Sequence, residues 1–141
     1  MRIIKALLIV ILIAVIGFFG WNWFYGPLKA KRQFAQYSEA MSTCAPLEQT
    51  VTAMMRGMTI ARSVKGTEGD TCGIEMQTPA PYPEFLVCDL PLDRMPVLAA
   101  DFLRQNDNIG IFGITGVQID INSGAPMQVA MNSPACRIER R

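Results

Sequence analysis

The chain begins with an apolar stretch, residues 6–25, which reads ALLIVILIAVIGFFGWNWFY. Only Asn22 in this stretch is strongly polar, and no residue in it carries charge. Twenty residues of α-helix rise about 30 Å, which matches the hydrocarbon thickness of a bilayer. Trp21, Trp23 and Tyr25 cluster at its carboxyl end, and such amphipathic rings favour the membrane–water boundary. The stretch therefore predicts a transmembrane helix that anchors the chain.

A cleaved secretory signal peptide is the alternative interpretation of the same stretch. Arg2 and Lys5 supply the charged start that a signal peptide needs. However, the apolar run is longer than the ~7–15 residues of a usual signal core, and no small-x-small cleavage site follows it. We therefore expect an uncleaved anchor, and under either interpretation an exported remainder.

The cysteines orient the chain, because the charges on the two sides of the anchor are nearly balanced. Arg2 and Lys5 precede the apolar stretch, and three cations at residues 29–32 follow it. Four cysteines in a small exported domain indicate two disulfides, whereas in a reducing compartment they would be buried thiols. We expect a single-pass protein of the bacterial inner membrane with its amino terminus in the cytoplasm. All the cysteines then lie in the periplasm, at Cys44, Cys72, Cys88 and Cys136.

This interpretation divides the chain into four segments. They are a cytoplasmic amino terminus at 1–5, the transmembrane helix at 6–25, a juxtamembrane helix or linker at 26–43, and a periplasmic domain at 44–141. The domain is small enough for cross-links to be useful supplements to its core. We expect an α+β fold in which a three-stranded antiparallel meander, a covering helix and a carboxyl-terminal hairpin are held by disulfides.

Helical spacing of apolar residues appears on both sides of Pro46. Ala30, Phe34, Tyr37 and Met41 share one face of a predicted juxtamembrane helix, while the other face is charged and either meets lipid phosphates or is simply solvated. Pro46 suits a helix start. The residues after it predict a second helix, although the threonines near Val51 favour a strand locally. Its apolar face would hold Leu47, Val51, Met54, Met55 and Met58.

From residue 59 the apolar period changes to two, which predicts a meander of three strands. Ile60, Arg62 and Val64 share one face of the first strand, residues 66–70 form a turn, and the second strand alternates from residue 72 to 76. A proline-rich turn at 78–83 leads to a third strand at 84–88.

The register of this meander predicts the disulfides. If the second turn centres on Ala80, Cys72 faces Cys88, and Ile74 faces Leu86, so that the apolar side chains share a face. Facing residues are close enough for a disulfide. We therefore prefer Cys72–Cys88 with Cys44–Cys136 among the three possible pairings.

The remainder predicts one helix and one hairpin. Asp93 can cap an amphipathic helix that covers the meander and ends near residues 105–108. A hairpin about Gly124 would follow, and residues 137–141 would form a charged tail. The helix face is Met95, Leu98, Ala99, Phe102 and Leu103. The hairpin face is Val117, Ile119 and Ile121 with Met127, Val129 and Met131.

Few residues point to chemistry. The chain has no histidine, which excludes catalytic triads that need one and His-based zinc sites. The carboxylates are scattered, and no C-x-x-C pair is present, so we expect no enzyme, no catalytic residue and no cofactor. Met54, Met55 and Met58 are the one speculative metal set, because thioethers hold Cu(I), but the same spacing suits apolar packing.

A glycine-rich apolar segment at 109–116 matches neither a P-loop nor a dinucleotide motif. Gly110, Gly113 and Gly116 recur in it at every third residue. We expect either a flexible buried loop or an exposed contact patch for a partner or a lipid surface.

Residues 44–90 resemble small exported bacterial proteins of unknown function that carry a cysteine, a Gly-x-x-Gly-Asp-x-Cys turn and a further cysteine on a strand. The matching residues are Cys44, Gly66, Gly69, Asp70, Cys72 and Cys88. The resemblance implies a cysteine-framed domain and transfers no site.

These features together predict a non-catalytic, membrane-anchored binding or accessory protein of the periplasm. Its expected partners are the lipid bilayer and a membrane or periplasmic protein that belongs to an inner-membrane or envelope complex, and nucleic acid is not expected because the charge is mixed and totals +1. The alternative is a Cu(I)- or thiol-handling protein that uses the methionine set and the cysteines.

Overall fold

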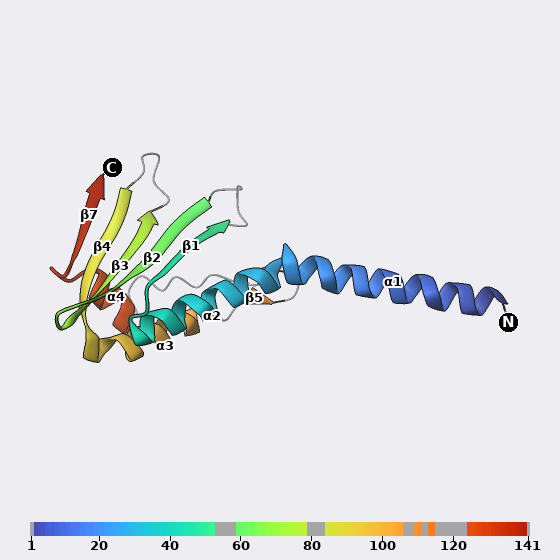
Figure 1. The fold of residues 1–141 in the computed structure, drawn as a ribbon, viewed down its shortest axis with the longest axis horizontal. Coiled ribbons are helices and arrows are strands. Elements are labelled where there is room, and N and C mark those ends of the chain that lie inside the picture. Colours follow the sequence, from blue (N-terminus) through green and yellow to red (C-terminus); the bar gives the residue numbers. More distant parts are fainter. Residues whose placement is uncertain are drawn as a thin grey trace.

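Two helices follow one another at the amino end of the computed structural model (Figure 1). α1 spans Arg2–Phe24 and α2 spans Pro27–Thr43, so that only two residues separate them. The structure describes residues 2–52, 59–78, 84–105, 109–110, 113–114 and 124–140.

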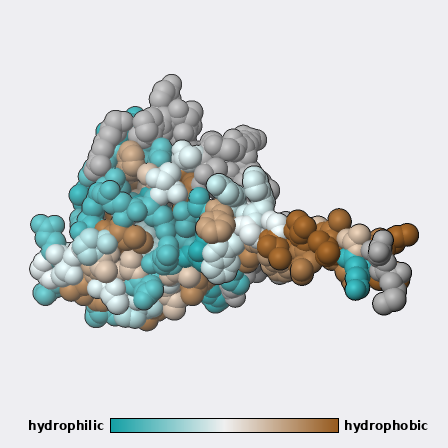
Figure 2. All heavy atoms as spheres, turned by 45° about the vertical axis from the view of Figure 1, so that its right-hand side comes forward, coloured by the Kyte–Doolittle hydropathy of each residue, from teal (hydrophilic) through white to brown (hydrophobic). Residues whose placement is uncertain are grey.

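α1 projects from the rest of the molecule, and its side chains are exposed from Ile3 to Phe19. Figure 2 shows hydrophobic residues along this projection and mostly hydrophilic residues on the visible face of the domain. In the described part of the chain, one helical segment is long and apolar enough to cross a membrane. A signal sequence has the same length and composition, so α1 is an anchor or a signal.

Five antiparallel strands form the main sheet in the order β1-β2-β3-β4-β7. The short helix η1, Leu92–Arg94, leads from β4 into α3, Met95–Gln105, and α4 spans Pro126–Met131. Two short strands, β5 at Ile109–Gly110 and β6 at Gly113–Ile114, pair with each other. The strands of the main sheet are β1 Leu47–Thr52, β2 Thr59–Glu68, β3 Thr71–Thr78, β4 Glu84–Pro91 and β7 Cys136–Arg140.

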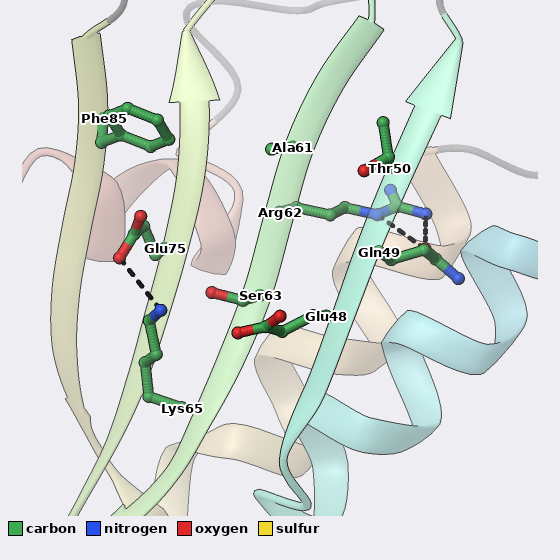
Figure 3. Close-up of a pocket in the computed structure, with 9 residues that line it drawn as sticks. All are labelled: Glu48, Gln49, Thr50, Ala61, Arg62, Ser63, Lys65, Glu75 and Phe85. Carbon is green, nitrogen blue, oxygen red and sulfur yellow. Dashed lines mark hydrogen bonds and ion pairs between the residues drawn. The ribbon is translucent and has the colours of Figure 1, made fainter. Parts of the chain in front are cut away.

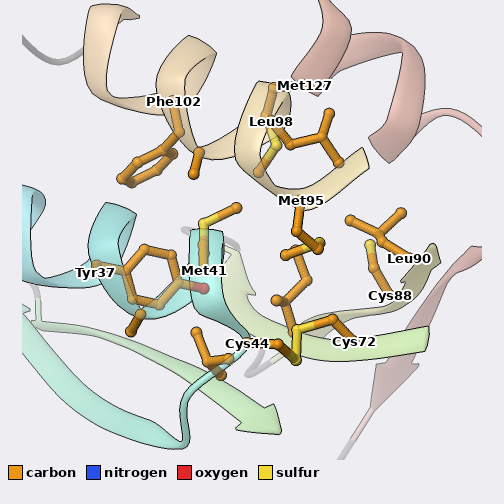
Figure 4. Close-up of a cluster of buried hydrophobic side chains, with 14 residues drawn as sticks. Tyr37, Met41, Cys44, Cys72, Cys88, Leu90, Met95, Leu98, Phe102 and Met127 are labelled. Atoms are coloured by element: carbon orange, nitrogen blue, oxygen red, sulfur yellow. A yellow bond between two sulfur atoms is a disulfide. The ribbon is translucent and has the colours of Figure 1, made fainter. Parts of the chain in front are cut away.

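The helices α2, α3 and α4 cover one face of the sheet, and the core lies between them (Figure 4). Strand residues alternate between faces, so Val64, Ile74 and Leu90 point toward the helices and are buried. Met41 and Met95 meet them from α2 and α3 and are fully buried. The α+β fold, the meander and the covering helix are therefore confirmed, and the sheet extends the meander by one strand on each side.

Two disulfides hold this domain, and the pairing that we preferred is wrong. Cys44 bonds Cys72, which ties the end of α2 to β3, and Cys88 bonds Cys136, which ties β4 to β7. The cause is a register two residues away from the predicted one, because Ile74 pairs with Cys88 rather than with Leu86. A shift of two keeps each side chain on its predicted face, so the apolar faces are correct although the cysteine partners are not.

Two predicted elements at other positions are also corrected. Leu47–Thr52 is a strand rather than a helix, because its β-branched residues pair with β2. Pro126–Met131 is a helix rather than half of a hairpin, with its proline in the first turn. The other half, Val117, Ile119 and Ile121, lies outside the described residues.

The expected charged tail is the edge strand β7, whose residues pair with β4 from Cys88↔Cys136 to Glu84↔Arg140. Asp93 does not cap α3, because η1 precedes that helix and the first residue of α3 is Met95. The predicted α3 face is buried at Met95, Leu98 and Phe102, whereas Leu103 is exposed.

Candidate functional site

A groove of about 750 Å³ lies between α3, α4 and the end of β4. Leu90 and Leu98 are buried residues of its lining, and the segment that joins α4 to β7 closes one side. Val97 and Val129 stand on opposite helices and are 56 % and 59 % exposed, so they form two apolar lips. The remaining lining residues are Pro91, Arg94, Gly124, Pro126, Ala130, Ser133, Pro134 and Ala135.

Asp101 on α3 fixes the position of α4, which forms one wall of the groove. Its Oδ2 accepts a hydrogen bond from the backbone N–H of Met127 at 3.0 Å, and α4 has no side-chain cap of its own. Arg104 and Gln105 donate to the same carboxylate at 2.7 and 3.0 Å. The side chain thus supplies from a neighbouring helix what an N-cap residue would supply locally.

The ionised form of Asp101 is the one that these contacts stabilise. Burial alone would raise the pKa of the carboxyl group, but the hydrogen bonds from Arg104, Met127 and Gln105 and the charge of Arg104 outweigh it. The pKa of Asp101 therefore lies below its ordinary value.

Arg94 is the charged side chain at the rim of the groove. It is exposed, and its guanidinium makes no ion pair or hydrogen bond within the part of the chain that the structure describes. The other lining residues that the structure describes carry no charge. The groove thus combines an apolar interior with one available cation.

A second candidate site is a buried arginine on the helix-covered face of the sheet. Arg62 is only 6 % exposed, and its Nε and Nη2 donate to Oε1 of Gln49 at 2.9 and 2.6 Å. Its guanidinium carbon lies 4.4 Å from the ring centre of Phe34, 4.5 Å from that of Tyr37 and 5.7 Å from that of Phe102. Among the described residues, no carboxylate forms an ion pair with Arg62.

This aromatic enclosure shifts two pKa values in ways that follow from burial. Desolvation lowers the pKa of Arg62 to about 10, against an opposing effect of Tyr37. Desolvation also raises the pKa of Tyr37 to about 12, while the charge of Arg62 lowers it. The arginine stays cationic near neutral pH and joins α2 and α3 to the sheet by cation–π contacts, so its role is structural.

The opposite face of the sheet carries a shallow polar hollow of about 220 Å³ (Figure 3). Lys65 and Glu75 form an ion pair there at 3.4 Å, and Glu48 and Ser63 lie nearby. No group of three or more Cys, Asp or Glu side chains in the described residues is placed to hold a metal ion. The described residues of the hollow thus present the Lys65–Glu75 ion pair.

The junction of α1 and α2 places a cation beside the ring of Trp23. Arg32 donates from Nη2 to the backbone carbonyl of Trp23 at 2.6 Å, and its guanidinium carbon lies 4.3 Å from the Trp23 ring centre. Lys29 and Lys31 are exposed on the same turn. These are the cations that the sequence placed next to the predicted membrane boundary.

Among the residues that the sequence singled out, the structure describes the four cysteines but not the three methionines. All four cysteines are consumed in disulfides, so no free thiol remains. Met54, Met55 and Met58 lie outside the described residues, and so does Gly116. Sequence reasoning missed the groove and the role of Arg62, although an arginine on the same strand face as Ile60 and Val64 was a visible signal.

Comparison of the chain with protein-family models, with curated proteins and with solved structures finds no match.

Proposed function

We propose that this protein is a membrane-anchored accessory protein of the bacterial cell envelope, whose periplasmic domain binds a partner without catalysing a reaction. The observation that carries the proposal is the passage of one helical region from the apolar projection into the core. α1 exposes apolar side chains on all sides, and α2 follows after two residues and buries Tyr37 and Met41 under the sheet.

This continuity favours holding a domain at a defined position over merely retaining it near a membrane. A flexible linker of glycine and serine would leave the domain free to rotate. Here the Arg32–Trp23 contact links the two helices, and the Cys44–Cys72 disulfide fastens the end of α2 to β3. Such a connection supports a role in which the domain surface is presented to a complex in a fixed orientation.

The two disulfides support a proposal for the compartment and the orientation of the chain. Disulfides persist in oxidising compartments such as the bacterial periplasm. Two disulfides in the domain therefore support an inner-membrane anchor with the amino terminus in the cytoplasm and the domain outside. The absence of histidine from the sequence supports a binding role over acid–base catalysis.

The proposal is tested by crosslinking the full chain in bacterial membranes and identifying its adducts by mass spectrometry. The control carries a four-residue Gly-Ser insertion between Gly26 and Pro27, which keeps the anchor and the domain but frees their orientation. We expect one defined protein adduct with the native chain and a weaker adduct with the insertion. Absence of any adduct above that of an anchor-only chain contradicts the proposal.

The compartment is tested separately by alkylating thiols in intact cells before and after reduction. We expect the four cysteines to react with a thiol reagent only after reduction. Complete alkylation without reductant would place the domain in a reducing compartment and overturn the assignment.

A further inference from the structure

We propose that the groove between α3 and α4 binds the hydrocarbon chain of a small anionic amphiphile, with the head group of the ligand paired to Arg94. This small-molecule site is separate from the surface that would bind the protein partner proposed above. Three properties of the groove support it: the chemistry of its lining, its volume and its charge.

The lining offers apolar contact and few hydrogen bonds. Pro91, Pro126 and Pro134 have no backbone N–H to donate, and the hydroxyl of Ser133 already donates to the carbonyl of Ala130 at 2.6 Å. A polar ligand would lose its water contacts here without replacement, whereas a hydrocarbon chain has none to lose. The interior thus favours an alkyl chain.

The volume of the groove suits a small ligand. The groove holds about 750 Å³, within the roughly 300–1,000 Å³ of pockets that bind small molecules.

The charge of the rim selects the head group. Among the described residues of the lining, Arg94 is the one that carries a charge, and none is a carboxylate that would oppose an anion. Its guanidinium is free of partners within the described residues, so a carboxylate or phosphate can form charge-assisted hydrogen bonds with it. An amphiphile with a cationic head meets repulsion at the same place.

The walls of the groove are preformed, which lowers the cost of binding. Asp101 fixes the start of α4 through the N–H of Met127. The other side is held where the N–H of Asp89 donates to the carbonyl of Ala135 at 2.9 Å, next to the Cys88–Cys136 disulfide.

The test uses the full chain in nanodiscs and two probes that share one alkyl chain, dodecanoate and dodecyltrimethylammonium. Binding is measured by native mass spectrometry and calorimetry, with empty nanodiscs subtracted. We expect one dodecanoate per chain, with an affinity at least roughly tenfold above that of the cationic probe. Arg94→Gln should remove most of this preference, whereas Lys65→Gln, which removes a cation from the opposite face of the sheet, should leave it unchanged.

Two further variants test the apolar lips. Val97→Glu and Val129→Glu alter exposed positions, so both chains should fold, and each places a carboxylate where the alkyl chain would enter. We expect both to abolish dodecanoate binding. Equal binding of the two probes, binding unaffected by Arg94→Gln, or a protein adduct instead of amphiphile at a photocrosslinker in place of Val129 would overturn the proposal.

Discussion

α1 and α2 are consecutive helices of one chain that meet opposite surroundings. α1 is apolar on every side and exposed from Ile3 to Phe19, whereas α2 packs one face, with Tyr37 and Met41, under the sheet. A helix that is apolar all round needs a nonpolar environment, and a helix with one apolar stripe needs a single packing partner. The domain therefore stabilises α2, whereas α1 depends on surroundings outside the domain.

Removing the Cys44–Cys72 disulfide should have the largest effect on stability, and it should destabilise the domain while leaving α1 unchanged. The cysteines are 28 residues apart in the sequence. Closing a loop of this length stabilises a fold by about 3–4 kcal/mol in the chain-entropy model. Cys44→Ala/Cys72→Ala should lower the unfolding free energy of the domain by this amount in chemical denaturation. The helical circular dichroism of α1 in nanodiscs should persist, and its simultaneous loss would mean that the domain also stabilises α1.

Replacing Arg62 should have the next largest effect, because it contacts α2, α3 and β1 together. Arg62→Ala removes two hydrogen bonds to Gln49 and the contacts with three aromatic rings, and we expect a loss of about 2–3 kcal/mol. Arg62→Lys keeps the charge and stem but not the planar fork, so its loss should be smaller. Equal unfolding free energies for Arg62→Ala and the native chain would contradict a joining role for this residue.

The contact between α3 and α4 predicts a pH-dependent effect. Asp101→Asn should destabilise the domain by about 1–2 kcal/mol at neutral pH, because a neutral amide holds the N–H of Met127 and the Arg104 guanidinium less strongly.

The sign of the pH dependence follows from the lowered pKa of Asp101. The carboxylate contributes its stability above the unfolded-state pKa of about 3.9, and the contribution is lost as pH falls through the lower folded-state pKa. The difference in unfolding free energy between the native chain and Asp101→Asn should therefore shrink below about pH 4. A difference that grows on acidification would show that the pKa of Asp101 is raised instead.

The smallest effect on stability is expected at the junction itself. A Cβ atom at Gly26 would lie 2.5 Å from Oδ1 and 2.9 Å from Cα of Asn22. Gly26→Ala should therefore change the angle between α1 and α2 while altering domain stability by less than about 0.5 kcal/mol. Gly20→Ala is the matched control, because a Cβ atom there meets nothing within 4 Å. The same angle between α1 and α2 in both variants would show that the junction tolerates a Cβ atom at Gly26.

The patterns that repeat along one element were predictable from sequence. The apolar run of α1, the 3.6-residue period of α3 and the alternation in β3 each depend on local spacing, and all three elements are present. The face of each meander strand was also predictable, because a register error of two residues preserves it.

The pairings between distant segments were not predictable in the same way. The disulfide partners depend on the register between β3 and β4 and on where α2 ends, and neither is set by local spacing. Residues 126–131 alternate like a strand, yet Pro126 starts a helix. The N–H of Met127 in the first turn of this helix donates to Asp101, which lies 26 positions earlier in the sequence. The groove lies between the two helices that this long-range contact links, so no local motif indicates it.

The proposed rigid connection between α1 and the domain is tested most directly by a distance across the junction. Spin labels on noncanonical residues at Val15 and Glu48, in the full chain in nanodiscs, report the distance from α1 to β1 by double electron–electron resonance. We expect one narrow distance distribution for the native chain and a broad one after Gly-Ser insertion between Gly26 and Pro27. An equally broad distribution in both chains would contradict this expectation and reduce α1 to a flexible tether.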